Sequence, residues 1–249
     1  MIYNTKAIVL NVHKYGNSSL ICNLFTESYG KVNIIAKGAR TIKNPNSAIL
    51  QPCNHIDLVY YSKSTRNIQT LKEASICVNF SNQSYNHMIY GLTVVDIINK
   101  ISFDDNPCEI IFRLVNKSLE KMNSAPEDLI KTYYLFFQLQ LLIYIGFQPA
   151  FFKCFKCQTK LNVGNFCNDI GHMVCLRCST KKIVSIEKEG LDYIYFLMTT
   201  HIDDINQNIP NNKKCLNSIN NVLNKFILYH ISELKKSKLF TNELENELI

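Results

Sequence analysis

Five of the ten cysteines in this 249-residue chain lie between residues 154 and 178, and four of these five form two C-x-x-C pairs. The pairs are Cys154 with Cys157 and Cys175 with Cys178, and residues 158–174 separate them. A two-residue gap lets one tight turn aim two thiolates at one ion, and two such turns complete a tetrahedron around Zn²⁺. The spacing therefore predicts a zinc ribbon at about residues 150–182, with these four cysteines as its ligands.

We expect this zinc site to be structural, because four thiolates fill the coordination of one ion and leave no open position for a substrate. Residues 151–182 contain six Lys and Arg but one acid, and this positive surplus favours thiolates. Cys167 and His172 are possible substitute ligands, although neither has a close partner at ligand spacing. Thiol–disulfide exchange is the rival use of C-x-x-C pairs, but it predicts a single pair on a βαβ scaffold.

Residues 1–80 have the pattern of a small β-barrel. Five runs rich in Val, Ile, Leu, Tyr and Thr are separated by turn sequences such as Gly16-Asn17-Ser18. Five short strands at this spacing predict a barrel or a sandwich, and a long basic loop between the third and fourth runs fits an OB-fold. The expected strands cover residues 5–15, 19–26, 30–39, 55–62 and 67–76.

From about residue 81 the apolar period becomes helical. Helices are expected to begin at Asn106-Pro107, at a capping box from Ser124 to Glu127, near Ser185 and near Asn212. The helix that follows the capping box is apolar nearly all round, which predicts a place at the centre of a bundle.

Together these patterns predict an α+β multidomain protein. A five-stranded OB-fold barrel covers residues 1–80, and an α-helical bundle with the inserted zinc ribbon covers residues 81–249. The most apolar run, residues 133–145, contains two glutamines and is too short to span a bilayer. Because the N-terminus also has no charged-then-apolar signal pattern, the expected location is cytoplasmic.

Positive charge is concentrated in the N-terminal third. Residues 1–80 contain nine Lys and Arg and three acids, whereas residues 81–249 contain 18 and 17. A concentrated positive field predicts a polyanion, and an OB-fold binds nucleic acid through cations along the backbone and aromatic rings under the bases. The candidate cations are Lys14, Lys31, Lys37, Arg40, Lys43 and Arg66, with Lys63 in the same turn as Arg66. Candidate stacking residues are Tyr15, Tyr29, Tyr60 and Tyr61, of which about half are expected to face outward.

The sequence offers no catalytic constellation. It contains no G-x-x-x-x-G-K-[ST], H-E-x-x-H or G-x-S-x-G motif, and its eight glycines form no dinucleotide-binding loop. We therefore expect a protein that is not an enzyme. Besides nucleic-acid binding, the same features allow a zinc-ribbon adaptor that acts through protein contacts in transcription or translation.

The sequence resembles the bacterial recombination mediator family RecO over nearly its whole length. The resemblance is carried by KAIVLNVHKYGNSSLICNLFTESYGKVNIIAKGAR, LQPCNHIDLVYY, LLIYIGFQPAFFKCFKC and KKSKLF. By position, the two C-x-x-C pairs match the family's zinc ligands and residues 37–40 match its OB-face cations. The chain departs from the family pattern at Gln158, where a glycine commonly stands, and at Gly171-His172, where a Gly-Gly usually precedes the third cysteine.

The resemblance also implies an activity. Such proteins bind single- and double-stranded DNA and anneal complementary strands, in association with the nucleoid. With a RecR partner they help to load RecA onto DNA coated with single-strand-binding protein. The C-terminal tail of single-strand-binding protein is a further expected partner.

Overall fold

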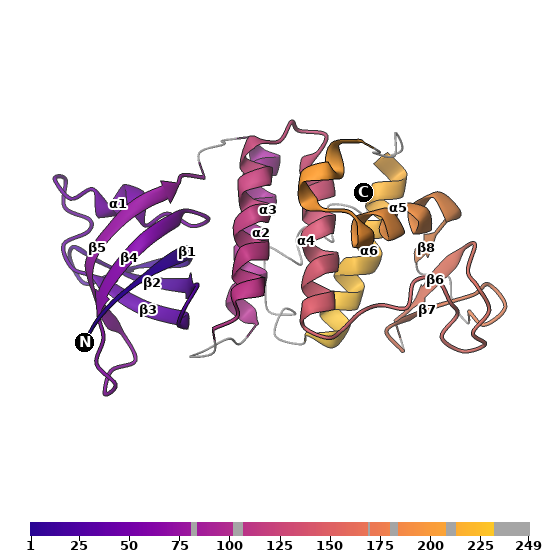
Figure 1. Cartoon of the computed structure of the whole chain (residues 1–249), viewed down its shortest axis with the longest axis horizontal. Coiled ribbons are helices and arrows are strands. Elements are labelled where there is room, and N and C mark those ends of the chain that lie inside the picture. The colour runs from indigo at the N-terminus through magenta and orange to yellow at the C-terminus, as the bar shows by residue number, and fades with distance from the viewer. Residues whose placement is uncertain (81–83, 102–106, 169, 180–183, 208–212, 232–249) are drawn as a thin grey trace. The chain divides into compact units, whose positions relative to one another are not determined.

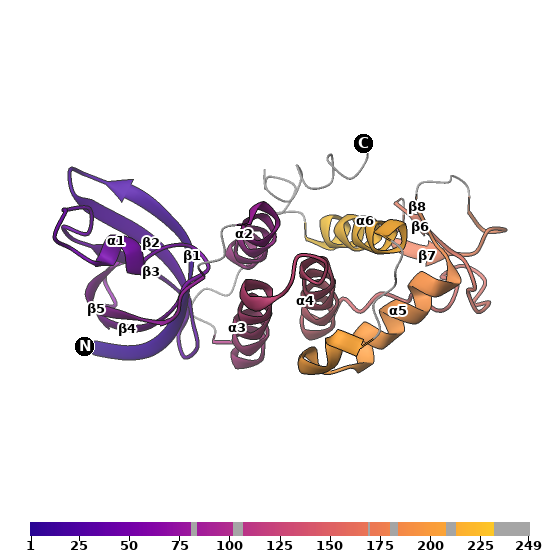
Figure 2. The ribbon, with the colours of Figure 1, turned by 90° about the horizontal axis from the view of Figure 1, so that it is seen from above.

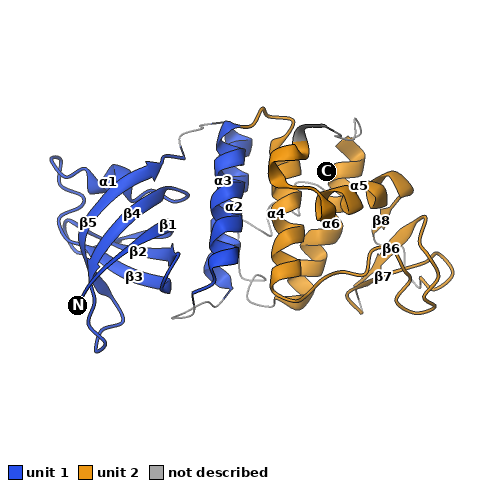
Figure 3. Ribbon diagram, in the orientation of Figure 1, with its two compact units in different colours: residues 1–124 blue, residues 125–249 orange. Residues whose placement is uncertain are grey.

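The computed structural model describes residues 1–80, 84–101, 107–168, 170–179, 184–207 and 213–231 (Figure 1). The chain forms two compact units, residues 1–124 and residues 125–249 (Figure 3). The first unit contains a barrel with one short helix and two long helices, and the second contains the remaining helices and the cysteine-rich sheet. The domain limit expected at residues 80 and 81 stays a prediction.

The barrel is closed and OB-like, with the strand order β1-β2-β3-β5-β4. Its strands pair antiparallel, except that β3 pairs in parallel with β5. The five predicted strands are confirmed as β1 (Ile2–Tyr15), β2 (Ser19–Thr26), β3 (Gly30–Ala36), β4 (His55–Tyr61) and β5 (Gln69–Val78). A short helix, α1 (Asn46–Ile49), lies in the long connection that the sequence predicts as a loop.

Strand β1 closes the barrel because it pairs with two neighbours. Its first half pairs with β4, from Ile2 to Ile8, and its second half pairs with β2, from Ala7 to Tyr15. The register with β2 shifts between Val9 and Asn11. An irregularity of this kind bends a strand and increases its twist, which is what closure of a sheet requires.

Alternation along β3 separates the core of the barrel from its outer face. Val32, Ile34 and Ala36 are buried among the apolar side chains of the barrel. Lys31 and Asn33 lie at the alternate positions and are half-buried or exposed. Because side chains alternate along a strand, the lysine and asparagine occupy the outer face.

Helices α2 (Tyr85–Lys100) and α3 (Glu109–Ser124) complete the first unit. The ring of Phe112 on α3 lies 5.9 Å from the ring of Phe25 and 5.9 Å from that of His55, both on the barrel. The buried face of α3 therefore packs its aromatic side chain against the barrel core.

In the second unit, helix α4 (Ile130–Tyr144) is buried on nearly all sides, as its sequence predicts. It packs with α5 (Lys188–Thr199), α6 (Lys213–His230) and the 3-10 helix η1 (Ile202–Gln207), and Figure 2 shows α4 and α6 side by side. Gln138 on α4 donates a buried hydrogen bond to Asn224 on α6 at 2.6 Å. Such bonds satisfy polar groups that the bundle removes from water.

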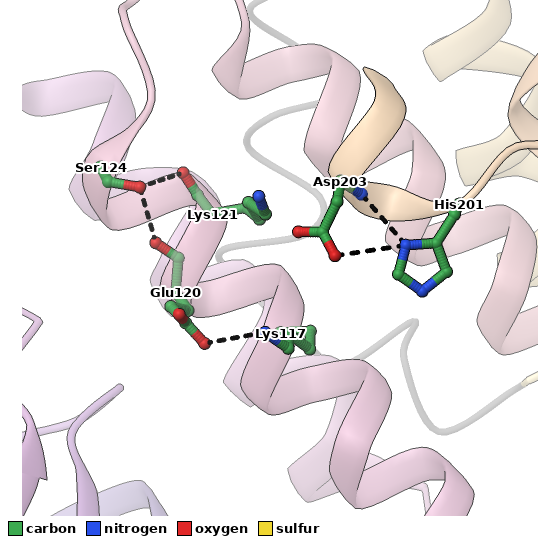
Figure 4. A network of polar contacts seen from close by, with 6 residues as sticks. All are labelled: Lys117, Glu120, Lys121, Ser124, His201 and Asp203. Atoms are coloured by element: carbon green, nitrogen blue, oxygen red, sulfur yellow. Dashed lines mark hydrogen bonds and ion pairs between the residues drawn. The ribbon is translucent and has the colours of Figure 1, made fainter. Parts of the chain in front are cut away.

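The predicted capping box at Ser124 is wrong. Ser124 is the last residue of α3, and its hydroxyl group donates to the carbonyl oxygens of Glu120 and Lys121 at 3.1 and 3.4 Å (Figure 4). The next helix, α4, begins at Ile130. Serine hydroxyls compete for carbonyls one turn back in a helix, and here that competition replaces the cap. Asn106, the other predicted cap, lies outside the described residues.

The cysteine-rich sheet has the strand order β7-β6-β8. Its strands are β6 (Gly164–Cys167), β7 (His172–Val174) and β8 (Val184–Ile186). Among the helices within the described residues, none is both long and apolar enough to cross a membrane.

Candidate functional site

The four predicted metal ligands meet in space. The Sγ atoms of Cys154, Cys157, Cys175 and Cys178 all lie within 4.8 Å of one another. Both C-x-x-C turns close with the same hydrogen bond, from the fourth residue after the first cysteine back to its carbonyl. Gln158 N–H donates to Cys154 O at 2.8 Å, and Ser179 N–H donates to Cys175 O at 3.0 Å.

The donor set fits a tetrahedral metal ion. The Sγ atoms of Cys157 and Cys175 lie 3.7 Å apart, and Zn–S bonds of about 2.3 Å would place tetrahedral ligands about 3.8 Å apart. A hydrogen bond with the Thr159 hydroxyl lowers the pKa of Cys157 to about 6, whereas the Cys175 sulfur raises the pKa of Cys178 to about 12. Sulfur atoms this close resist carrying negative charge together, and a divalent cation between them would remove that conflict.

One of the two departures from the family pattern occupies a special backbone position. Gln158 has a φ of 59°, in the left-handed region that glycine adopts without strain. The glutamine therefore carries about 1–2 kcal/mol of strain that a glycine would avoid. Gly171 keeps a φ of 64°, and a Cβ atom there would lie 2.4 Å from the ring of Tyr229. Only glycine fits at this second position.

The two possible substitute ligands lie outside the group of four, which is the only metal-compatible group among the described residues. Cys167 is buried and faces His172 across the β6–β7 ladder. The ring of His172 stacks on that of Phe155, with centroids 4.2 Å apart and an interplanar angle of 18°. Burial lowers the pKa of His172, which agrees with packing among aromatic rings.

The structure places two of the predicted nucleic-acid-binding cations near the β1–β2 turn. Lys14 lies at the end of β1 and Lys37 directly after β3, where both strands flank Leu20 of β2. Lys43 follows in the next turn, and all three side chains are exposed. We refer to Lys14, Lys37 and Lys43 as the turn group.

Arg40 forms hydrogen bonds within the barrel domain itself. Its guanidinium group donates to the carbonyl oxygens of Asn17 and Gly16 in the β1–β2 turn, the second at 3.4 Å. Its backbone N–H also donates to Ser18 O at 2.8 Å. Arg40 therefore ties the segment after β3 to this turn, in addition to any contact with a ligand.

Lys31 and Arg66 belong to a different place, a cleft of about 610 Å³ on the first unit. We call it the barrel cleft. Lys63 joins them, so three cations line one hollow. The lining residues are Tyr3, Ser28, Tyr29, Lys31, Val32, Asn33, Tyr60, Ser62, Lys63, Ser64, Arg66, Asn67, Gln69 and Pro107.

Three tyrosines gather at the barrel cleft. The ring of Tyr3 stacks on Tyr60 at 5.6 Å and meets Tyr29 edge-on at 4.6 Å. Tyr60 is buried and Tyr29 half-buried, whereas Tyr15 and Tyr61 are exposed. The expectation that half of the four candidate tyrosines face outward is met, but Tyr3 was not among the candidates.

Gln69 is a second residue of the cleft that the sequence did not single out. Its side-chain oxygen accepts a hydrogen bond from Lys63 N–H at 2.9 Å, and its amide donates to Arg66 O at 2.7 Å. Gln69 thus braces the β4–β5 loop that carries both cations. A glutamine at the first position of a strand that follows a polar turn was the available signal.

The comparisons with known proteins agree with this geometry. The family model described as "Recombination protein O N terminal" matches residues 1–80, and that described as "Recombination protein O C terminal" matches residues 82–239.

Three curated relatives are each called "DNA repair protein RecO". The Alkaliphilus metalliredigens protein is 26% identical over 96% of this chain and 98% of its own length. The Chloroherpeton thalassium protein is 26% identical over the whole of both chains. The Salinibacter ruber protein is 35% identical over 60% of this chain and 58% of its own length. With both halves matched by its family models, the chain belongs to the RecO family of DNA repair proteins.

Proposed function

We propose that this protein is a recombination mediator that binds single- and double-stranded DNA through its barrel and anneals complementary strands. The proposed binding and annealing involve no catalytic step. The observation that carries the proposal is the barrel cleft, in which Lys31, Lys63 and Arg66 surround a cluster of tyrosine rings. Proteins that hold single strands without sequence preference combine such cations with aromatic platforms.

The cleft is arranged to receive both parts of a nucleotide. Lys63 and Arg66 are exposed on the β4–β5 loop and can neutralise phosphates. Lys31 donates to Asn99 O at 3.1 Å, which holds its ammonium group at the wall of the cleft. Tyr29 is half-buried, so part of its ring surface remains for a base.

The turn group would extend the same path along β3. Lys37 follows Lys31 by six positions, or about 20 Å of strand at roughly 3.3 Å per residue. Asn33 lies between them on the same outer face. A single strand that follows β3 would leave the cleft and meet the turn group, so cations would contact its backbone at both ends. Neutralised in this way, two complementary strands repel each other less, and base pairing supplies the sequence choice.

We assign Zn²⁺ to the cysteine group and give it a structural role. When bound, the ion cross-links the two C-x-x-C turns and contributes to the folding of this short segment, on the order of 10–16 kcal/mol in isolated zinc-finger peptides. Four sulfur ligands leave no position for a substrate. The four cysteines therefore hold the ribbon in shape and make no contact with DNA themselves.

The proposed partners follow from the family. A RecR-type protein would join this chain to help load RecA onto DNA coated with single-strand-binding protein, whose C-terminal tail would bind the helical part of the chain. Pull-downs with and without that tail test the second contact. Equal recovery of both forms would remove the tail from the proposal.

An annealing assay tests the central activity. Two complementary oligonucleotides, one labelled with a donor dye and one with an acceptor, are mixed with the purified chain without a nucleotide cofactor, over a salt series. We expect annealing that is fast at low salt and slows steeply as salt rises. A chain that binds partner proteins but does not accelerate annealing would instead be a zinc-ribbon adaptor.

Matched variants locate the site. Lys63→Gln with Arg66→Gln should slow annealing, because both cations of the cleft loop are removed. Arg113→Gln with Lys117→Gln is the control, since it removes the same two charges from α3 of the same unit. Those side chains are exposed and form surface ion pairs with Glu109 and Glu120, which contribute about 0–1 kcal/mol each. Equal annealing by both double variants would move the site away from the cleft.

A further inference from the structure

The two C-x-x-C turns present the same two kinds of side chain to solvent. Each has an apolar residue followed by a cation between its cysteines, Phe155-Lys156 in the first turn and Leu176-Arg177 in the second. The exposed fraction is 46% for Phe155 and 60% for Leu176, and both cations are exposed. We propose that these four residues, the ribbon tip, form a second surface that binds single-stranded DNA.

The metal geometry brings the two turns together. Lys156 directly precedes Cys157, and Leu176 directly follows Cys175, and the Sγ atoms of these two cysteines are 3.7 Å apart. Lys156 Nζ also lies 3.4 Å from Cys178 O and donates to it across the cluster. The two apolar side chains and the two cations therefore belong to one continuous surface rather than to two separate turns.

The positive charge of the ribbon favours a polyanion as the ligand of the tip. Lys153 and Lys160 are exposed beside the tip, and residues 151–182 contain six Lys and Arg but one acid. A zinc ion with four thiolates carries a charge of −2, so the segment keeps a net charge of +3 when the metal is bound. A neutral apolar partner surface would not explain why a cation accompanies each exposed apolar residue.

Side-chain chemistry favours single-stranded DNA among polyanions. Single strands expose bases, which stack on aromatic and apolar side chains, and phosphates, which pair with cations. The ring of Phe155 has His172 on one side and remains partly exposed, so it offers a platform held in a fixed orientation. Isolated exposed apolar residues are common on proteins, but here the same pair of residues occurs twice around one metal site.

A second DNA surface would deepen the proposed function, on which it rests. Annealing requires two strands, and a chain with one surface on the barrel and another on the ribbon could hold one strand on each. The turn group and the barrel cleft would then serve one strand and the ribbon tip its complement.

Photo-cross-linking tests the proposal in the full-length, zinc-loaded chain. Phe155 and Leu176 are replaced one at a time by p-benzoyl-phenylalanine, which leaves Lys156 and Arg177 in place. The probe is a labelled oligothymidylate of about 30 nucleotides, longer than the roughly 4–16 that one OB-fold covers. The control is the same replacement at Ile110 on α3, whose exposed fraction of 50% lies between those of the two tip residues.

We expect both tip positions to cross-link to the oligonucleotide more strongly than residue 110. A yield at both tip positions no higher than at residue 110 would overturn the proposal. Cross-linking to an acidic peptide, such as polyglutamate, in place of the oligonucleotide would assign the tip to a protein partner and would also overturn it.

A charge variant gives a second readout. Lys156→Gln with Arg177→Gln should keep one zinc per chain and lower the magnitude of the salt slope of single-strand binding by about 1.4, or about 0.7 for each lost phosphate contact. If this variant loses its zinc, the cross-linking result decides. Repeating the cross-linking with Lys63→Gln and Arg66→Gln separates the two ideas. If the tip positions still cross-link and those substitutions leave DNA binding by the barrel unchanged, the barrel site is contradicted while the proposal for the ribbon tip stands.

Discussion

Gly171 lies so close to Tyr229 of α6 that a Cβ atom at residue 171 would fall 2.4 Å from the tyrosine ring. The glycine stands in the turn between β6 and β7, and its φ of 64° is itself unfavourable for other residues. The contact joins the ribbon to the helices of the second unit. The ribbon is therefore held from two sides, by its metal site and by α6.

Gly171→Ala should destabilise the second unit. The left-handed backbone adds about 1–2 kcal/mol of strain, and overpacking against the ring adds about 1–3 kcal/mol. Chemical unfolding with metal bound measures the sum. Tyr229→Leu combined with Gly171→Ala should recover the packing part only, because the backbone strain remains. A Gly171→Ala chain as stable as the parent would show that the ribbon does not pack on α6 in this way.

Substitutions at Arg40 and Lys37 should have different effects, the first on stability and the second on DNA binding, although the two residues are only three positions apart. Arg40→Gln removes the bonds to the carbonyls of the β1–β2 turn and should lower the free energy of unfolding by about 1–2 kcal/mol. Lys37→Gln, at an exposed position, should leave stability within about 0.5 kcal/mol and weaken DNA binding. Urea unfolding and anisotropy titrations on the same preparations measure both. Equal loss of stability in the two variants would contradict these separate roles.

Gln69 should act as a positioning residue for the cleft loop. Gln69→Ala removes the hydrogen bonds to Lys63 and Arg66 while keeping both cations. We expect weaker binding of single strands with an unchanged salt slope, because the number of phosphate contacts is preserved while the cost of ordering the loop rises. Gln69→Glu keeps the acceptor for Lys63 N–H, so the loop should stay better ordered than in Gln69→Ala. The added negative charge should itself weaken DNA binding. A slope reduced as far as that of the cation variants would mean that the loop no longer reaches the DNA.

His55 should make the first unit less stable in mild acid. Burial lowers the pKa of His55, and Lys6 lowers it further. Below its ordinary pKa of about 6.5 the unfolded chain takes up a proton that the folded chain resists, so stability is full above that pH and falls as the pH drops toward the folded pKa. Urea unfolding of the parent chain and of His55→Leu between pH 5 and 7.5 isolates this contribution. A pH dependence equally steep in both proteins would assign it to other groups.

Local patterns were enough to predict the five barrel strands, most of the helices and the metal ligands, whereas Ser185, near which a helix was expected to begin, lies in strand β8 and the helix begins at Lys188. The spacing of Cys154, Cys157, Cys175 and Cys178 specifies two turns that converge on one ion, so little tertiary information is needed. The alternation of β3 similarly predicts which of its residues face outward. Ser124 shows the limit of such reasoning, because its hydroxyl group had carbonyls one turn back as an alternative partner.

The barrel cleft could not be predicted, because closure of the barrel brings distant residues together. Tyr3 lies near the start of β1 and Tyr60 near the end of β4, and they become neighbours only through the β1–β4 ladder. The parallel pairing of β3 with β5 places Ile34 beside Gln69 and so brings the β4–β5 loop near Lys31. These long-range pairings leave no periodic signal in the sequence. For the same reason, nothing in the sequence indicated that Arg40 forms hydrogen bonds to the β1–β2 turn.

The salt dependence of single-strand binding tests the barrel site most directly. Anisotropy of a labelled oligothymidylate is measured over a salt series for the parent chain, for Lys63→Gln with Arg66→Gln, and for Arg113→Gln with Lys117→Gln. We predict a steep linear fall of log affinity with log salt, and a slope smaller in magnitude by about 1.4 for the cleft variant alone. A slope near zero for the parent chain, or the same slope for all three proteins, would contradict DNA binding through the barrel cleft.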